Sequence, residues 1–313
     1  MDAEILGIAA FAAAGTFYVM FLVDTLRRLI RRTAGRLRTT TAAVTLMIGA
    51  HLLAVGFLVE PRYLVVERLS VRLPVEKPLR IAHISDLHHH RDTDWLDRVA
   101  EAVLSARPDV VAITGDYFSR TRPDRRSVEQ VRTFLKRLCD RVPTVLSVGG
   151  NWDEPAVMES LMRGLPVLHE NVAVRRGNVV FHCVTWGARL DTAASRRLLR
   201  GYFDAAGGGA VVRVMLFHSP ELADRPSVRE RVDLYLCGHT HGGQVRLPFW
   251  GALFTASMTG KRYETGLYRL GRCRLYVNRG VGTALAPFRL NCPPEVAIID
   301  ILPEAATAGR KTP

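Results

Sequence analysis

The sequence predicts an α/β fold that follows two membrane-spanning helices. From Leu79 onwards, short apolar runs typical of buried strands alternate with amphipathic stretches at helical spacing. This alternation is the pattern of parallel strands covered by helices. Before residue 60, two uncharged apolar runs are each about as long as the roughly 20 residues that a helix needs to cross a bilayer.

The two apolar runs are residues 5–23 and 41–59, and we expect both to be transmembrane helices of a hairpin over residues 1–60. A cleaved signal peptide is the alternative for the first run. The acidic start and the position of the arginines after the run disfavour it. Six arginines lie between the runs: Arg27, Arg28, Arg31, Arg32, Arg36 and Arg38. The positive-inside rule puts this loop in the cytoplasm, so we expect a two-helix protein of the cell membrane whose C-terminal domain is extracytoplasmic.

The chain has 313 residues and a formal net charge of +13, which favours anionic ligands such as phosphates or anionic lipids. The basic residues form no patch interleaved with aromatic side chains, so nucleic-acid binding is not expected. The five cysteines include no CxxC pair, which argues against a zinc ribbon or a redox motif. Cys273 and Cys292 form a disulfide in one interpretation and remain buried thiols in the other.

Residues 61–78 are expected to link the membrane segment to the domain, and Tyr63–Leu73 alternates like an edge strand. The domain itself is expected to cover residues 79–302. Residues 303–313 are expected to form a flexible tail. Its first half predicts strands at Leu79–Ser85, Val110–Thr114 and Thr144–Val148, with helices at Trp95–Ala106 and Val128–Leu138.

After Asn171 the predicted strands follow one another more closely, which indicates a second sheet. One helix, Thr192–Phe203, interrupts them. The strands are Val172–Arg175, Val179–Thr185, Val211–Phe217, Asp233–Cys237, Val245–Leu247, Leu267–Leu270, Arg274–Val277 and Val296–Leu302.

Polar side chains follow five of these strands at the point where each ends. They are Asp86, Asp116, Asn151, His218 and His239, with His88 and His241 two residues further on in two cases. Ligands of open α/β sheets gather at the carboxyl ends of the strands, so these residues are expected on one rim. Carboxylate, amide and imidazole groups suit manganese, iron or zinc. Two such ions about 3.5–4 Å apart can clamp an in-line displacement at phosphorus.

In this order, Asp86-x-His88, Gly115-Asp116, Gly150-Asn151, His218 and Gly238-His239-x-His241 resemble the motifs of the calcineurin-like metallophosphoesterase superfamily. The resemblance extends over about residues 79–302 and is closest to the membrane-anchored or exported bacterial phosphodiesterase branch. It implies a four-layer α/β/β/α sandwich that holds two divalent ions, manganese first among the candidates, with iron or zinc as alternatives.

The resemblance also implies roles for the seven residues. Asp86, His88 and His241 would bind the first ion, and Asn151, His218 and His239 would bind the second. Asp116 would bridge the two ions and help to activate a hydroxide that attacks phosphorus. Asn151 would also contact a phosphate oxygen.

The sequence departs from the family pattern at Trp152, where a histidine commonly follows the asparagine. That histidine can protonate the leaving oxygen, whereas an indole has no transferable proton near neutral pH. We therefore expect a substrate with a good leaving group, such as a pyrophosphate, or a Trp152 that stacks on a base or a lipid chain. Neighbouring His89 or His90 is an alternative acid. Arg279 and Arg289 are candidates for binding phosphate, although both could be structural.

These observations predict a membrane-anchored, metal-dependent phosphohydrolase that cleaves a phosphodiester or pyrophosphate of a lipid or nucleotide-like substrate. Membrane lipid is the expected partner of the hairpin, and the oligomeric state is left open. One alternative is a UDP-2,3-diacylglucosamine pyrophosphatase of lipid A synthesis, which would need a cytoplasmic active site. The other is a non-catalytic metal-binding regulatory protein.

Overall fold

The structure is a computed structural model that describes residues 20–21, 23–28, 31, 35–89, 93–189, 193–204, 211–255 and 257–304. Its strands form two six-stranded mixed sheets and one two-stranded ribbon. The first sheet has the order β1-β14-β2-β3-β4-β5. These strands are β1 (Val65–Leu73), β14 (Glu295–Pro303), β2 (Leu79–Ile84), β3 (Val110–Thr114), β4 (Val145–Val148) and β5 (Val167–His169).

The second sheet has the order β12-β13-β9-β8-β7-β6, and its four central strands are parallel. These strands are β12 (Gly266–Leu270), β13 (Cys273–Val277), β9 (Leu234–Cys237), β8 (Val212–Leu216), β7 (Val179–Cys183) and β6 (Val172–Arg176). The ribbon pairs β10 (Arg246–Leu247) with β11 (Gly251–Ala252).

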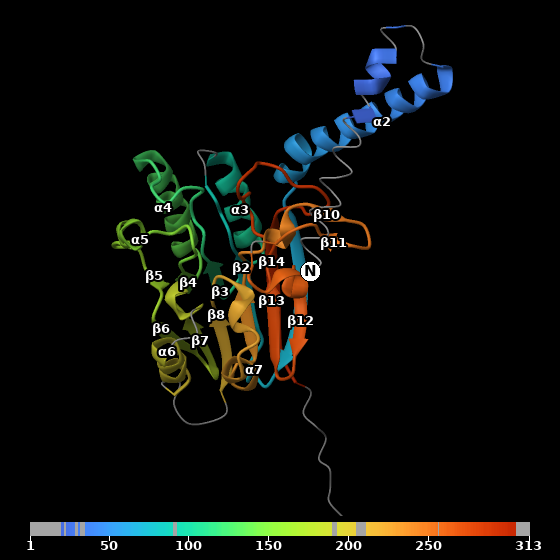
Figure 1. Cartoon of the computed structure of the whole chain (residues 1–313). Coiled ribbons are helices and arrows are strands. Elements are labelled where there is room, and N and C mark those ends of the chain that lie inside the picture. Colours follow the sequence, from blue (N-terminus) through green and yellow to red (C-terminus); the bar gives the residue numbers. More distant parts are fainter. Residues whose placement is uncertain are drawn as a thin grey trace, which may run out of the picture.

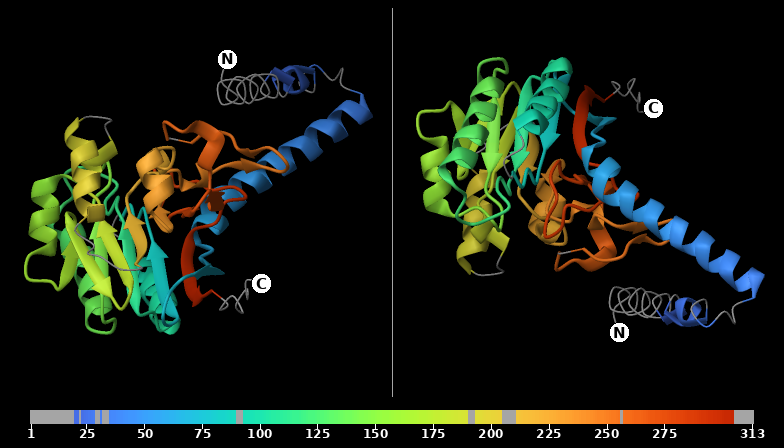
Figure 2. Two further views of the ribbon diagram at one scale, coloured as in Figure 1. Left: turned by 90° about the horizontal axis from the view of Figure 1, so that it is seen from below. Right: turned by 90° about the horizontal axis from the view of Figure 1, so that it is seen from above.

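Helices cover the outer faces of both sheets, which gives four layers (Figures 1 and 2). The first sheet carries α3 (Thr93–Ser105), α4 (Arg125–Cys139) and α5 (Pro155–Met162), and the second carries α6 (Ala193–Asp204) and α7 (Pro226–Arg231). A buried apolar cluster fills each of the three spaces between layers. The predicted α/β/β/α sandwich is therefore confirmed.

The chain forms these elements for local reasons that the sequence carries. Strand β3 is buried at all five positions, as expected for an inner strand of a parallel sheet that is covered on both faces. Helix α4 begins where the Asp124 side chain accepts a hydrogen bond from the backbone N–H of Ser127 at 2.8 Å, a typical N-cap. The expected edge strand is confirmed as β1, which pairs in parallel with β14.

The predicted second membrane segment lies within one continuous helical stretch, Arg36–Arg62. Helix α2 (Arg36–Ala54) continues into a π-helical turn (Val55–Val59) and a 3₁₀ turn (Glu60–Arg62) that leads to β1. The stretch projects away from the sandwich, and only 11% of its most apolar window is buried, so it is not a core helix (Figures 1 and 2). It is the one helix among the described residues that is long and apolar enough to cross a membrane.

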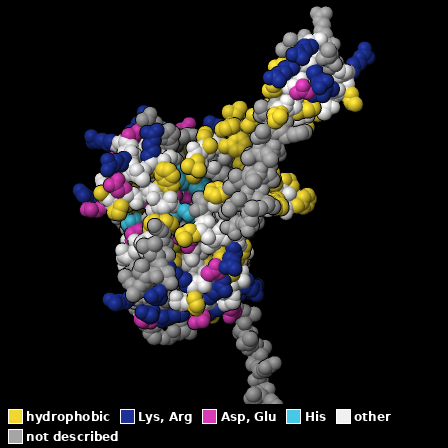
Figure 3. Space-filling model, in the orientation of Figure 1, with side chains coloured by type: hydrophobic (Ala, Val, Ile, Leu, Met, Phe, Trp, Pro, Cys, Tyr) yellow, Lys and Arg dark blue, Asp and Glu magenta, His cyan; other side chains and the backbone are white. Residues whose placement is uncertain are grey.

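The first predicted membrane segment, residues 5–23, lies outside the described residues apart from Met20, Phe21 and Val23. The two-helix hairpin therefore stays a prediction. Exposed apolar side chains lie along the visible part of helix α2, and basic side chains gather at its end far from the sandwich (Figure 3). All five cysteines are described, and each is a free thiol, so the structure contains no disulfide between Cys273 and Cys292.

Candidate metal centre

The predicted ligands lie on one rim, where strands of both sheets end. Asp86 follows β2, Asp116 follows β3, and Asn151 comes after β4. His218 and His239 follow β8 and β9 of the second sheet. The two sheets therefore face each other with their polar strand ends together, and the chain brings all seven predicted residues into one region.

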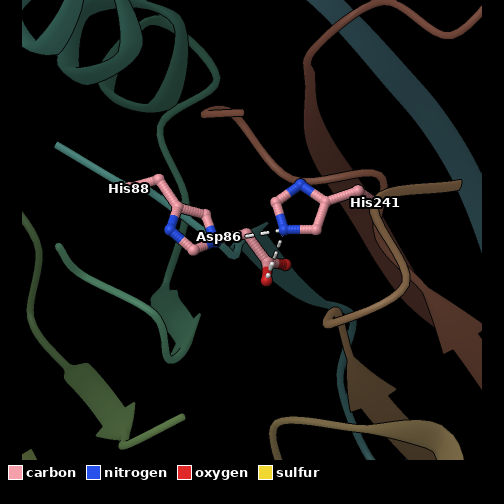
Figure 4. Close-up of side chains that lie close together, drawn as sticks. All are labelled: Asp86, His88 and His241. Atoms are coloured by element: carbon pink, nitrogen blue, oxygen red, sulfur yellow. Dashed lines mark hydrogen bonds and ion pairs between the residues drawn. The ribbon is translucent and has the colours of Figure 1, made fainter. Parts of the chain in front are cut away.

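The first group of potential ligands is Asp86, His88 and His241, whose side chains converge (Figure 4). The Nε2 atoms of His88 and His241 lie 3.1 Å apart. The Nε2 atom of His241 is 3.4 Å from Oδ1 of Asp86. All three side chains are buried, so an ion held between them would be shielded from most of the surrounding water.

The second group is Asp116, His218 and His239. The Nε2 atom of His218 is 3.3 Å from Oδ2 of Asp116 and 3.1 Å from Nδ1 of His239. Oδ1 of Asn151 is 3.1 Å from the same Nε2 atom, which adds a fourth potential ligand. Nδ1–H of His218 donates to the carbonyl of Thr114 at 2.6 Å, which leaves Nε2 as the ligand atom.

One oxygen of Asp116 lies next to both groups. Its Oδ2 atom is 3.5 Å from Nε2 of His88 in the first group and 3.3 Å from Nε2 of His218 in the second. The other oxygen, Oδ1, accepts a hydrogen bond from the backbone N–H of Trp152 at 3.0 Å. Asp116 thus has the position that a carboxylate shared by two ions requires.

The backbone at this rim is strained. Five of the seven residues have the positive φ angles of the left-handed region: Asp86 (51°), His88 (40°), Asp116 (55°), His239 (71°) and His241 (51°). Non-glycine residues rarely adopt this conformation, and it persists where the surrounding structure enforces it, often at functional sites. Here the first two loops support each other, since the backbone N–H groups of Asp86 and His88 donate to Gly115 and Asp116 at 2.9 Å.

Two glycines allow the loops to approach the carboxylates. A Cβ atom at Gly150 would collide with the side chain of Asp116, and one at Gly238 would collide with Ser85 and the side chain of Asp86. Both positions therefore need the smallest residue for reasons of space.

Two residues that sequence reasoning missed support the ligands. The carboxylate of Asp153 accepts hydrogen bonds from the backbone N–H groups of Asp116 (2.7 Å), Tyr117 (2.9 Å) and Gly150 (2.8 Å). It therefore ties the loop after β4 to the loop after β3. The sequence signal for the role of Asp153 is its position directly after Asn151-Trp152 in the third motif.

The indole of Trp186 covers the second group, with ring centroids 5.3 Å from His218 and 5.7 Å from His239. It also stacks on Phe217 at 5.6 Å. Trp186 follows β7, and no motif in the sequence marks it.

Neighbouring charges set the pKa values of Asp116 and His218 in the second group. Burial raises the pKa of Asp116, but the adjacent His218 and His88 outweigh it and lower this pKa to about 2. Burial lowers the pKa of His218, but the Asp116 and Asp86 carboxylates outweigh it and raise this pKa to about 10. The Asp116 and Asp86 carboxylates thus favour positive charge at the His218 side chain, where a cation would bind.

The first group is dominated by burial. It lowers the pKa of His88 to about 4 and that of His241 well below its usual value, so both imidazoles are neutral at pH 7. Neutral imidazoles have the lone pair that a metal ligand needs. Among the described residues, the ion-pair partners of Asp86 and Asp116 are histidines and include no lysine or arginine. Buried carboxylates surrounded by imidazole and amide donors fit divalent cations.

The three predicted substrate-binding residues lie in different surroundings. Trp152 is half-buried beside His88, with ring centroids 6.0 Å apart, so it borders the first group. Arg279 pairs with the buried carboxylate of Glu295. His89 lies nearby, but its Nε2 atom is 2.8 Å from the side-chain oxygen of Gln130. His90 is outside the described residues.

The predicted phosphate contact of Arg289 is wrong. This side chain is fully buried, and its guanidinium donates to four backbone carbonyls: Cys292 (2.9 Å), Gly282 (3.1 Å), Arg279 (2.8 Å) and Gly280 (3.2 Å). All three nitrogens are used in this way, so Arg289 fixes the loop that contains these residues. The sequence does not reveal whether an arginine is buried, so it could not distinguish an arginine that binds backbone carbonyls from an exposed one that binds phosphate.

The fold and the site together define a phosphoester hydrolase with two adjacent candidate metal-binding groups. Residues 79–243 match the calcineurin-like phosphoesterase family, and the chain belongs to it. It is 30% identical to the phosphodiesterase YaeI of Escherichia coli over 72% of this chain and 83% of that protein. It is 29% identical to the metallophosphoesterase YkuE of Bacillus subtilis over 70% and 76% of the two chains.

The name of a more distant relative specifies a substrate. The chain is 24% identical to the UDP-2,3-diacylglucosamine pyrophosphatase LpxG of Chlamydia muridarum over 85% of this chain and 98% of that protein.

Proposed function

We propose that this chain is a membrane-anchored phosphohydrolase that uses two divalent ions to cleave a phosphodiester or pyrophosphate bond of a lipid or nucleotide-like substrate. The observation that carries the proposal is the position of Asp116, one oxygen of which lies between the two groups of ligands. The similarity to a phosphodiesterase supports the diester.

In this proposal Asp86, His88 and His241 hold one ion, Asn151, His218 and His239 hold the other, and Asp116 contacts both. When bound, the two ions would activate water as a nucleophile and stabilise negative charge on the phosphoryl oxygens. Manganese is the first candidate, with iron or zinc as alternatives, because the donor set contains oxygen and imidazole nitrogen but no thiolate.

The residues of the chain perform the remaining tasks. Asp116 stays ionised because its pKa is low, so it is available as a ligand. Asn151 is exposed, unlike the other six predicted ligands, so its amide can also reach a phosphate oxygen of the substrate. Trp152 has no proton to give to a leaving oxygen. This favours a leaving group that departs unprotonated, such as a phosphate, over a simple alkoxide.

The membrane placement follows from α2 and the charges next to it. Basic side chains of the described residues gather at the end of α2 far from the sandwich, which supports a cytoplasmic loop and an extracytoplasmic domain (Figure 3). Alkaline phosphatase fusions after Arg32 and after Arg62 test this orientation. Activity from the Arg62 fusion alone is expected, and activity from the Arg32 fusion alone would reverse the assignment.

A second candidate function is the pyrophosphatase activity on UDP-2,3-diacylglucosamine, favoured by the similarity to LpxG. Its substrate is made in the cytoplasm, so it requires the opposite orientation, and the same fusions separate the two functions. The non-catalytic alternative has less support, because the potential ligands of both ions are retained.

The central experiment is hydrolysis of bis-p-nitrophenyl phosphate, an alkyl phosphomonoester and a nucleotide-sugar lipid by protein loaded with manganese, iron or zinc. We expect turnover of the diester or the pyrophosphate and its loss in Asp116→Ala. Full activity in Asp116→Ala would remove the shared-ligand role. Inactivity of every metal form on all three substrates would favour the non-catalytic alternative.

A further inference from the structure

A cavity of about 710 Å³ lies between the metal centre and the end of the membrane helix. His88 and Trp152 line it on the side of the metal centre, and Phe57, Pro61 and Arg62 line it on the side of the helix. Its size is within the range of roughly 300–1,000 Å³ that is common for small-molecule sites. The membrane-spanning stretch therefore contributes side chains to the same cavity as a predicted metal ligand.

The wall formed by the helix end is firmly attached to the domain. The backbone N–H of Arg289 donates to the carbonyl of Gly56 at 3.0 Å. The ring of Phe288 occupies the space beside Gly56 where a side chain would be, and it packs against Phe57 with centroids 4.7 Å apart. The carboxylate of Glu60 accepts hydrogen bonds from the backbone N–H groups of Asn291 (2.8 Å) and Cys292.

The loop just before Phe288 adds an apolar part of the lining, and folding does not explain its exposure and strain. Leu285 is 92% exposed and has a φ of 63°, which a bulky side chain rarely adopts. Ala286 and Pro287 follow it and also line the cavity. Exposed apolar surface and backbone strain each cost stability, so their coincidence at a cavity points to a ligand.

The cavity has both polar and apolar lining. Besides His88, the polar residues include the exposed Arg62 and Arg120, whereas Leu87, Trp95 and Val281 add apolar surface. A ligand that suits all of these surfaces has an anionic end and an apolar chain.

We infer that this cavity receives the apolar chain of an amphiphilic phosphate ester, with the chain between Phe57 and Leu285 and the phosphate at the His88 end. The inference rests on the proposed phosphohydrolase function and narrows its substrate class to amphiphiles with an apolar chain. The substrate enters beside α2, at the level where that helix leaves the bilayer, so its chain passes from lipid to cavity without exposure to water. The end of the membrane helix thereby determines specificity.

The test uses the full chain in detergent micelles of fixed composition and a series of p-nitrophenyl alkyl phosphates with ethyl, octyl and hexadecyl chains. The leaving group is the same throughout, so differences report binding of the chain. Each buried CH₂ group contributes up to about 0.8 kcal/mol, so we expect kcat/KM to rise at least about tenfold from ethyl to octyl.

Two variants separate the cavity from simple partitioning into micelles. Leu285→Glu introduces a charge at an exposed position, and Ala286→Trp fills part of the cavity. Each should reduce the octyl-to-ethyl ratio of kcat/KM at least about threefold. Leu267→Glu is the matched control, since Leu267 is an exposed residue of β12 that does not line the cavity, and it should preserve the ratio.

A ratio near one in the wild type, together with turnover of the ethyl ester, would overturn the inference and leave the proposed function standing. A high ratio that persists in both cavity variants would show partitioning alone and would also overturn it. No turnover of any ester by any metal form would remove the proposed function and the inference together.

Discussion

The carboxylate of Asp153 holds the backbone of Asp116 through a 2.7 Å hydrogen bond from the Asp116 N–H group. The same carboxylate binds the N–H of Gly150, beside Asn151. One residue thus ties the proposed shared ligand, Asp116, to the loop that carries Asn151, a proposed ligand of the second ion.

We predict that Asp153→Asn lowers metal affinity 10- to 100-fold, the usual effect of losing a group that orients ligands. The amide NH₂ would face a backbone N–H and leave it unpaired, at a cost of about 1–3 kcal/mol of stability. Calorimetric titration with manganese and urea unfolding measure the two effects. Glu154→Gln at the next, partly exposed position is the control. Unchanged affinity in Asp153→Asn would mean that Asp153 has no orienting role.

Asp116→Asn should lower the number of bound ions per chain from two to one or none. The amide keeps the shape of the side chain but cannot supply a negative charge to two cations. Metal analysis of the purified protein after gel filtration measures the stoichiometry. Asp300→Asn, which changes a carboxylate paired with Arg80 away from the site, should retain both ions. Two ions in Asp116→Asn would contradict a shared ligand.

Trp152→His should raise turnover of alkyl phosphomonoesters, because it restores a side chain that can protonate the leaving oxygen. General acid catalysis is typically worth 10²–10⁴-fold, so even an imperfectly placed histidine should give more than about threefold. Turnover of p-nitrophenyl esters, whose leaving group needs no proton, serves as the internal control and should change little. A smaller gain on the alkyl ester would show that the absence of a histidine at position 152 does not limit its cleavage.

Arg289→Ala should destabilise the fold by about 3 kcal/mol or more, since it leaves four buried carbonyls without their donor and each costs about 1–3 kcal/mol. Chemical unfolding checks this. Arg68→Ala on the exposed face of β1 should have little effect. If Arg289→Ala retained full stability and only raised KM, the phosphate contact expected from the sequence would be restored.

The tryptophans beside the two groups should report metal binding separately. Trp186 lies near His218 and His239, and Trp152 lies near His88. Manganese should quench the fluorescence of both, and Trp186→Phe should remove the part that belongs to the second group. A chelator should reverse the quenching. Identical quenching in Trp186→Phe would argue against metal at the second group.

The sequence predicted the framework of the site well because its ligands follow strands of a regular kind. Strand β3 has the predicted bounds, Val110–Thr114, and Asp116 follows it by two residues. Such runs of buried β-branched residues are recognisable without knowledge of their neighbours. The short elements α5, β5 and α7 were not predicted, since each contains too few residues for a period to show.

Contacts between residues far apart in the chain could not be predicted from the sequence. Trp186 covers the second group only because β7 is adjacent to β8 in the sheet, and strand order is not visible in the sequence. In the sequence, Glu60 has the position expected for the polar end of a membrane segment. In the structure its carboxylate accepts hydrogen bonds from the backbone N–H groups of Asn291 and Cys292, more than 230 residues later.

The bond from Glu60 to Cys292 bears on how the enzyme should be isolated. The thiol of Cys292 donates to the carbonyl of His241 at 3.2 Å, so Cys292 connects the proposed membrane anchor to a predicted metal ligand. A water-soluble fragment that begins at Tyr63 would keep every ligand but lose Glu60 and one side of the cavity. Such a fragment would still cleave small chromogenic esters while losing its preference among natural substrates. If the cavity selects the substrate as proposed, screens on truncated protein would find an unselective phosphoesterase, and only the intact chain would show its preference.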